Sequence, residues 1–279
     1  MIDSINKELR AAAQIGDSES CLALIKKGGD VHSLGTFHWQ AIHKAARFGH
    51  RNICQILLED GADINARTLF GQTALHLAVV SEHTETLFWL IGEGCDIHAS
   101  DDQGRTALHG AAERGLTGFC VGLIDKGSNV NAKDNAGRTA LYGPAVRGFT
   151  ETCLALIDRG AAANVRDNQG CTLLHLAAMF YPYTIGRYTS ADRKRHLYTF
   201  SALINKGADV AAKTECGHTP LHTAAWSGQA DTCQVLLEHG ADAHSKNSSG
   251  QTPLDVAVER EHHACVTALR TWLSAGDPV

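Results

Sequence analysis

A ten-residue phrase recurs in this chain at intervals of 33 residues, and this period constrains the fold more than any other feature. The phrase reads GQTALHLAVV where it begins at Gly71. It returns in register at Gly104, Gly137 and Gly170, and after a longer interval at Gly217 and Gly250. A period of this length, built on T-P-L-H-x-A, is typical of stacked two-helix units. Such a stack exposes an extended surface instead of enclosing one large core.

Extrapolation of the period assigns the whole chain to eight repeats. His38 takes the place of Gly71 in the second repeat, and Ile5 takes it in the first. The interval between Gly170 and Gly217 is 14 residues longer than one period, which indicates an insertion near 182–195. We therefore expect a single domain over residues 1–279. Its repeats span about 2–34, 35–67, 68–100, 101–133, 134–166, 167–213, 214–246 and 247–279.

Each repeat predicts two helices. Thr73 stands where the first helix needs an N-cap, and the next position is proline in the last two repeats, as at Pro220. Proline suits the first position of a helix because the N–H of that residue has no intrahelical partner. Leu75 and Ala78 then follow at helical spacing. The second helix of each repeat ends at a glycine, such as Gly61, and glycine favours a left-handed C-cap.

These residues resemble the ankyrin repeat, whose pattern reads GxTPLHxAA followed by a second helix that ends in LLxxGADVNA. The resemblance covers the whole chain. It implies an all-α solenoid in which short β-hairpin connections project from paired antiparallel helices. It also implies that the hairpins and the first helices form a concave face that binds other proteins. The first and last repeats depart from the pattern at Lys7, Glu8, Arg10 and Asp255, and we interpret these departures as solvent-facing caps.

The composition narrows the partner and the compartment. The net charge of −5 and the isoelectric point near 6.3 disfavour nucleic acid as a general partner. The N-terminal residues MIDSINKELR contain no apolar run, so we expect no signal peptide. No segment approaches the roughly 20 apolar residues of a membrane helix. We therefore expect a cytoplasmic protein that does not insert into a membrane.

The many cysteines and histidines fall into the register of the repeat. One position inside the second helix holds Cys21, Cys54, Cys120, Cys153 and Cys233, and we interpret these cysteines as small buried apolar residues. The histidine of the T-x-L-H motif is His43, His76, His109, His175 and His222. The resemblance implies that this histidine joins neighbouring turns by hydrogen bonds. Because the chain also lacks a CxxC pair, we expect no metal site.

Motifs of catalysis are missing from the sequence. It contains no nucleophile elbow, phosphate-binding loop, dinucleotide fingerprint or HExxH motif. Acidic pairs such as Asp101 and Asp102 fall at hairpin tips, and nothing places them in a cleft. We therefore expect no enzymatic activity and no cofactor.

The resemblance places partner contacts at the hairpin tips and on the exposed flank of each first helix. In the second and third repeats these positions hold Phe37, Trp39, Arg47, Phe48, Leu69 and Phe70. Exposed apolar clusters mark interaction sites. The alternative is that Phe37 and Phe70 pack against the neighbouring hairpin.

Arginines occupy the same positions in the fourth and fifth repeats, as Arg105, Arg114, Arg138 and Arg147. Their guanidinium groups suit carboxylates or phosphates of a partner. The alternative is that they pair with nearby carboxylates of this chain, and exposed pairs of that kind contribute about 0–1 kcal/mol.

The later repeats add Met179, Phe180 and Trp226 to this face, and the insertion adds Tyr183, Arg187 and Tyr188. Tyrosine and arginine are frequent in interface hot spots, although the insertion can equally be a loop that covers the adjacent core. Ser190 is predicted to start a lengthened second helix. Pro144 falls inside the first helix of the fifth repeat, where we expect it to remove a hydrogen bond and kink the chain.

These observations favour a non-catalytic scaffold or adaptor that binds another protein on its concave face. The strip of aromatic, basic and again aromatic residues indicates an extended or helical partner segment with acidic character. Two alternatives remain: a microbial effector that binds or inhibits a host protein, and a regulatory subunit of a separate enzyme. Self-association through the exposed apolar residues also remains open.

Overall fold

The computed structural model describes residues 2–179 and 190–275. Within these residues the chain forms sixteen α-helices and one 3-10 helix, η1 (Thr36–His38), and strand pairing is limited to one antiparallel bridge between Ser100 and Thr106. The predicted all-α class is confirmed. The connections keep the hairpin form because their ends are joined by backbone hydrogen bonds, such as that from Thr68 N–H to Gln72 O at 2.9 Å.

The first helices of the repeats are short, mostly six or seven residues long. They are α1 (Ile2–Ile15), α3 (Ala41–Arg47), α5 (Ala74–Val80), α7 (Ala107–Glu113), α9 (Tyr142–Arg147), α11 (Leu173–Ala178), α13 (Pro220–Trp226) and α15 (Pro253–Glu259). The second helices are α2 (Ser18–Lys26), α4 (Arg51–Glu59), α6 (Thr84–Gly92), α8 (Thr117–Asp125), α10 (Thr150–Ile157), α12 (Ser190–Asn205), α14 (Ala230–Glu238) and α16 (His263–Ala275).

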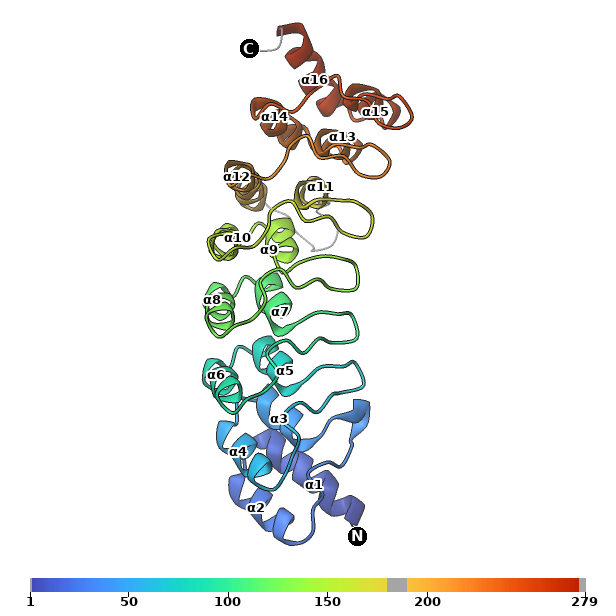
Figure 1. The fold of residues 1–279 in the computed structure, drawn as a ribbon. Coiled ribbons are helices and arrows are strands. Elements are labelled where there is room, and N and C mark those ends of the chain that lie inside the picture. Colours follow the sequence, from blue (N-terminus) through green and yellow to red (C-terminus); the bar gives the residue numbers. More distant parts are fainter. Residues whose placement is uncertain (1, 180–189, 276–279) are drawn as a thin grey trace. The chain divides into compact units, whose positions relative to one another are not determined.

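The chain divides into two compact units. Unit 1 comprises residues 1–111 and 118–129, and unit 2 comprises residues 112–117 and 130–279. In unit 1 the first helices α1, α3 and α5 pack on one another in order, and the second helices α2, α4 and α6 do the same. In unit 2 the first helices α9, α11, α13 and α15 form one such row, and α10, α12, α14 and α16 form the other. Within each unit the connections between repeats project on the side of the first helices (Figure 1).

The core of each unit lies between its two rows of helices. Leu57 and Leu236 are completely buried in second helices, whereas the neighbouring Leu58 is only half-buried. The five cysteines of the second-helix register are also buried, which confirms them as core residues. Burial raises the pKa of the Cys54 and Cys120 thiols to about 12. These thiols therefore stay protonated and pack as apolar groups, because a thiolate in the core would lose its hydration.

The motif histidine caps one helix and binds the next hairpin. The backbone N–H of Thr73 donates to His76 Nδ1 at 3.3 Å, and His76 Nε2 lies 3.0 Å from Arg105 O. These partners assign the neutral tautomer with the proton on Nε2. Burial lowers the pKa of His76, which favours this neutral form. His175 and His222 make the same pair of contacts. His43 also accepts the N–H three residues before it, and its Nε2 bonds Ala66 O, an earlier carbonyl of the next hairpin, so the predicted link between neighbouring turns is confirmed for these four histidines.

In the fifth repeat a tyrosine takes the place of the motif histidine and makes the link to the next hairpin. The Tyr142 hydroxyl lies 2.8 Å from Val165 O and 3.1 Å from Cys171 O, so it replaces the histidine as donor to the next hairpin. Helix α9 begins at Tyr142, two residues later than α7 does in register. Pro144 therefore lies in the first turn, where its missing N–H interrupts no hydrogen bond inside the helix. The expected kink within the helix is wrong, because the helix starts late instead.

Helix α12 begins at Ser190 and has 16 residues, compared with nine in α14. The lengthened second helix predicted from Ser190 is thus present. His196 in its added turns is buried, and His196 Nε2 lies 3.0 Å from Ala177 O. Thr199 Oγ1 lies 2.6 Å from Thr150 Oγ1 on α10. The start of α12 therefore adds His196 to the core of unit 2, whereas Thr199 holds the same buried place as Thr232 in α14.

Candidate functional site

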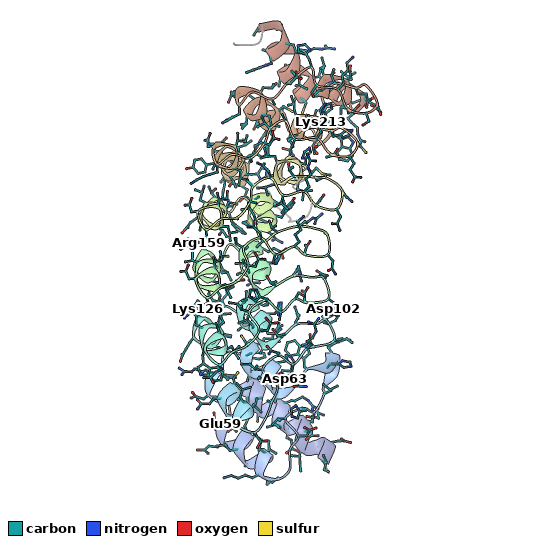
Figure 2. All side chains as sticks on the ribbon, viewed as in Figure 1. Glu59, Asp63, Asp102, Lys126, Arg159 and Lys213 are labelled. Atoms are coloured by element: carbon teal, nitrogen blue, oxygen red, sulfur yellow. The ribbon has the colours of Figure 1, made fainter. Side chains whose placement is uncertain are left out.

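In unit 1, each hairpin tip is joined to the tip of the next repeat by a backbone hydrogen bond. Leu69 N–H donates to Phe37 O at 2.8 Å, and Asp102 N–H donates to Phe70 O at 3.1 Å. In Figure 2, Asp102 lies at a tip, whereas Glu59 lies at the end of a second helix. The Asp102 carboxylate also accepts from Arg67 at 3.1 Å. These bonds hold the tip side chains of unit 1 in a fixed order.

Three apolar side chains form an exposed group at these tips, which we call the aromatic cluster: Phe37, Leu69 and Phe70. The Phe37 and Phe70 rings have centroids 5.7 Å apart and planes inclined by 34°. Each ring is nevertheless 55% exposed, and Leu69 is 49% exposed. The rings pack on each other, as the second interpretation of the sequence expected, and both residues still remain more than half exposed. Phe48, at the C-cap of α3, is exposed as well.

The backbone that carries Phe37 is strained. Phe37 and His38 both have a φ of 57°, in the left-handed region that residues with a side chain rarely occupy. His38 holds the place of turn glycines such as Gly71 and Gly104, which also have a positive φ, so the left-handed conformation at Phe37 is the departure from the other repeats. The hairpin also differs two residues earlier, at Gly35. In other repeats this place holds a residue such as Asp101, whose Oδ1 accepts the backbone N–H of Gln103 and Arg105. Gly35 has no such oxygen, and the segment folds into the 3-10 turn η1 instead.

Trp39 lies beneath two cations of α3. Lys44 Nζ is 4.8 Å and Arg47 Cζ is 5.5 Å from the centroid of the indole ring. Trp39 is half-buried, and Arg47 is exposed. Cation–π contacts of this kind contribute about 0.5–1 kcal/mol at exposed sites. Trp39 and Arg47, which the sequence placed among the contact positions of the second repeat, thus contact each other.

Trp39 and Lys44 also border a cavity that the sequence analysis did not predict, which we call the basic pocket. It has a volume of about 300 Å³ and is lined chiefly by Lys7, Arg10, Gln14, Gly35, Trp39 and Lys44. The signal was present in the sequence. Lys7, Arg10 and Gln14 lie three and four residues apart, which puts them on one face of a helix. We had interpreted Lys7 and Arg10 only as a polar cap.

The predicted arginine positions differ from this pocket because their guanidinium groups meet carboxylates. Arg105 Nη2 lies 3.1 Å from Asp101 Oδ2 in unit 1. In unit 2, Arg147 Nη2 lies 2.8 Å from Glu113 Oε1, and Arg138 Nε lies 3.8 Å from Asp167 Oδ2. Arg114 is exposed. Much of the positive charge at three of these four positions is therefore offset within the chain.

The structure brings together two of the predicted residues of unit 2. Met179 and Trp226, 42% and 39% exposed, line one cavity of about 450 Å³ with Cys216, His218 and Thr223. The Arg260 guanidinium lies 4.2 Å from the centroid of the Trp226 ring. Phe180, Tyr183, Arg187 and Tyr188 lie outside the described residues. Of the basic residues near the insertion, Arg193 pairs with Asp231 at 2.6 Å and Arg195 pairs with Asp192.

No group of three or more histidine, cysteine, aspartate or glutamate side chains among residues 2–179 and 190–275 is arranged to hold a metal ion. In the same part of the chain, no helix combines the length and the apolar character needed to cross a membrane.

The chain was also compared with known proteins. A family model described as ankyrin repeats matches it over residues 9–101, 80–167, 108–188 and 188–275. None of the curated proteins matches it. Ankyrin repeats generally serve as scaffolds for protein–protein interaction. The matched ranges run over nearly all of the chain and agree with its rows of paired helices, so the protein belongs to the ankyrin repeat family.

Proposed function

We propose that this protein is a non-catalytic scaffold or adaptor that binds a partner protein on the face formed by its hairpins and first helices. The observation that supports this most is the aromatic cluster, where Phe37, Leu69 and Phe70 remain about half exposed at adjoining tips. Monomeric proteins rarely leave contiguous large apolar side chains in water unless they have a binding role. The strained backbone at Phe37 adds weight, because such strain concentrates at functional sites.

The test is affinity purification from a lysate of the source cells, with the proteins retained by each variant measured by quantitative mass spectrometry. The wild-type chain is compared with the double variant Phe37→Ser and Phe70→Ser. The control is Leu22→Ser, which removes a 43% exposed apolar side chain from α2, on the second-helix side of the same unit. We expect one or more proteins to be lost with the double variant and kept with the control. Equal retention by all three chains would refute the assignment of this face.

The same experiment separates the alternative roles. A retained enzyme whose activity changes on addition of this chain would identify a regulatory subunit. A retained protein from a different organism, in a lysate of host cells, would identify an effector. Retention of the chain itself, with a dimer in sedimentation, would identify the aromatic cluster as a self-association surface.

A further inference from the structure

The basic pocket of unit 1 is built from two first helices and one hairpin. Helices α1 and α3 pack side by side (Figure 1). Lys7 and Arg10 of α1 line one wall of the pocket, and Lys44 of α3 lines another, together with Trp39. Three cationic groups thus converge on a cavity of about 300 Å³ that also has an aromatic wall.

These cations have no carboxylate partner. Within residues 2–179 and 190–275, neither Lys7, Arg10, Lys44 nor the adjacent Arg47 forms an ion pair. The Arg10 guanidinium donates to the neutral Ser33 hydroxyl at 2.7 Å. Burial, and then the charges of Arg47 and Arg10, lower the pKa of Lys44. Like charges gathered at a partly buried site repel one another, and a bound anion would offset that repulsion.

Gly35 is the reason why the pocket exists. In three later repeats this place holds an aspartate: Asp101, Asp134 and Asp167. Glycine here removes that negative charge. It also makes room, because a Cβ on Gly35 would lie 2.7 Å from Arg10 Nε. The same residue therefore leaves the site without the carboxylate that those three repeats have, and lets a guanidinium group occupy the space.

The pocket continues into an apolar surface. Thr36 lies at the pocket, and the next residue, Phe37, belongs to the aromatic cluster. A ligand that fits both features carries a negative group beside a large apolar group. The pocket is concave and small, which suits one side chain better than the flat surface of a membrane. The net charge of −5 disfavours a nucleic acid.

We propose that the basic pocket receives the carboxylate of an aspartate or glutamate in the partner protein, while a neighbouring large apolar residue of the same segment packs on the aromatic cluster. This proposal rests on the proposed function and specifies its partner. The carboxylate accepts hydrogen bonds from Arg10, Lys7 and Lys44, and charge-assisted bonds of this kind are roughly twice as strong as neutral ones. Trp39 forms the wall against which the methylene groups of the acidic side chain lie.

The test uses short random peptides displayed on phage and selected on the full chain. We expect the selected peptides to be enriched in aspartate or glutamate next to a large apolar residue. A synthetic copy of the strongest peptide is then measured by calorimetry, beside copies in which its acidic residues are changed to the amides or to phosphoserine. The amide copy should bind at least about tenfold more weakly. Selection of peptides without acidic residues, or binding of the phosphoserine copy alone, would overturn the proposal.

Variants of the chain locate the bound carboxylate. Lys44→Glu and Gly35→Asp should each weaken the acidic peptide at least about tenfold, because one reverses a pocket charge and the other restores the aspartate of later repeats. Lys27→Glu is the matched control, since it makes the same charge change at an exposed residue next to α2 and should change binding less than about twofold. Circular dichroism melts confirm that each variant folds. Equal loss with Lys27→Glu would show unspecific attraction and refute the pocket.

Failure of this proposal is distinguishable from failure of the proposed function. One outcome is that the selected peptides are apolar, bind more weakly to the Phe37→Ser and Phe70→Ser variant, and bind equally well to Lys44→Glu. In that case the face binds a protein segment, but the pocket binds no carboxylate. If no peptide is selected on this face and the lysate experiment also shows no difference between the variants, both fail.

Discussion

The second and fifth repeats carry different kinds of side chain at the same two positions of the repeat. Trp39 and Phe48 in the second repeat stand where Arg138 and Arg147 stand in the fifth. In the fifth repeat those arginines face Asp167 and Glu113, so their charge is largely offset. In the second repeat the aromatic rings remain partly exposed, and among the described residues no carboxylate forms an ion pair with Lys44 or Arg47 beside them.

The difference shows how few substitutions convert a structural surface into a candidate binding surface. Gly35 in place of an aspartate removes the hairpin oxygen and leaves room for the Arg10 side chain, and the nearby Phe37 adopts a left-handed φ. The fifth repeat keeps Asp134, whose Oδ1 accepts the backbone N–H of Ala136 and Arg138. Its hairpin is therefore regular and its arginines are held in place. The hairpin with Asp134 therefore accepts its own backbone N–H groups through a side-chain oxygen, whereas the hairpin with Gly35 has no such acceptor.

The largest expected effect in this comparison is that of pH, because several buried histidines contribute together. Burial lowers the pKa of His43, and likewise of His76, His175, His196 and His222. Above the ordinary pKa of 6.5 these histidines are neutral in both the folded and the unfolded chain, so the fold has its full stability. Below 6.5 the unfolded chain binds protons that the buried histidines resist, so the free energy of unfolding decreases as the pH falls. The free energy of unfolding in urea should therefore fall between about pH 7.5 and pH 5. An unchanged value would show that these histidines are protonated at no cost.

The comparison sharpens this prediction, because Tyr142 replaces the histidine in the fifth repeat. Burial raises its pKa further above the ordinary value of 10, so it stays neutral throughout this range. Hydrogen-exchange mass spectrometry, corrected for intrinsic rates, should show more loss of protection at 61–67 than at 161–167 when the pH is lowered. His43 binds Ala66 O in the first of these segments, and Tyr142 binds Val165 O in the second. Equal loss in both would mean that the bridging side chain does not control the effect.

An intermediate effect is expected when the turn residues of the two repeats are exchanged. Gly137 has a φ of 79°, and a Cβ there would lie 2.5 Å from Asn168 Oδ1. Gly137→His should lower the free energy of unfolding by about 2 kcal/mol or more. His38→Gly should raise it by about 0.5–1 kcal/mol, because it relieves a φ of 57° but adds freedom to the unfolded chain. Urea unfolding measures both, and destabilisation by His38→Gly would show that this turn is unstrained.

The smallest effect concerns the charges themselves. Arg147→Gln should cost about 0–1 kcal/mol, because its exposed pair with Glu113 is screened by water. Lys44→Gln removes the repulsion from Arg10 and Arg47 and also the cation–π contact with Trp39, which act in opposite directions, so its net effect should be within about 0.5 kcal/mol of zero. Urea unfolding at low and high salt measures both variants. Added salt should reduce the cost of Arg147→Gln, and a cost of Lys44→Gln that falls with salt in the same way would contradict the absence of an ion pair at Lys44.

Much of this structure could be predicted from the register of the repeat. The helix pairs, the buried cysteines, the linking histidines and the helix from Ser190 follow from local spacing and from the type of each residue. Pro144 was misplaced because helix starts were assumed to be identical in every repeat, whereas α9 begins two residues late. Lys7 and Arg10 could not be recognised as a site from the sequence, because the pocket also needs Trp39 and Lys44, which lie 29 to 37 residues away along the chain.

By itself, the sequence determined that this chain stacks helix pairs and which positions of each repeat reach the hairpin tips. The reason is that turns, caps and helical faces depend on residues within one period. Only the tertiary structure decided which of the exposed cations are neutralised. A carboxylate from the neighbouring repeat reaches Arg138 and Arg147, while none reaches Lys44. That outcome depends on side-chain direction across two repeats, because electrostatic pairing acts through space and the spacing along the chain does not specify it.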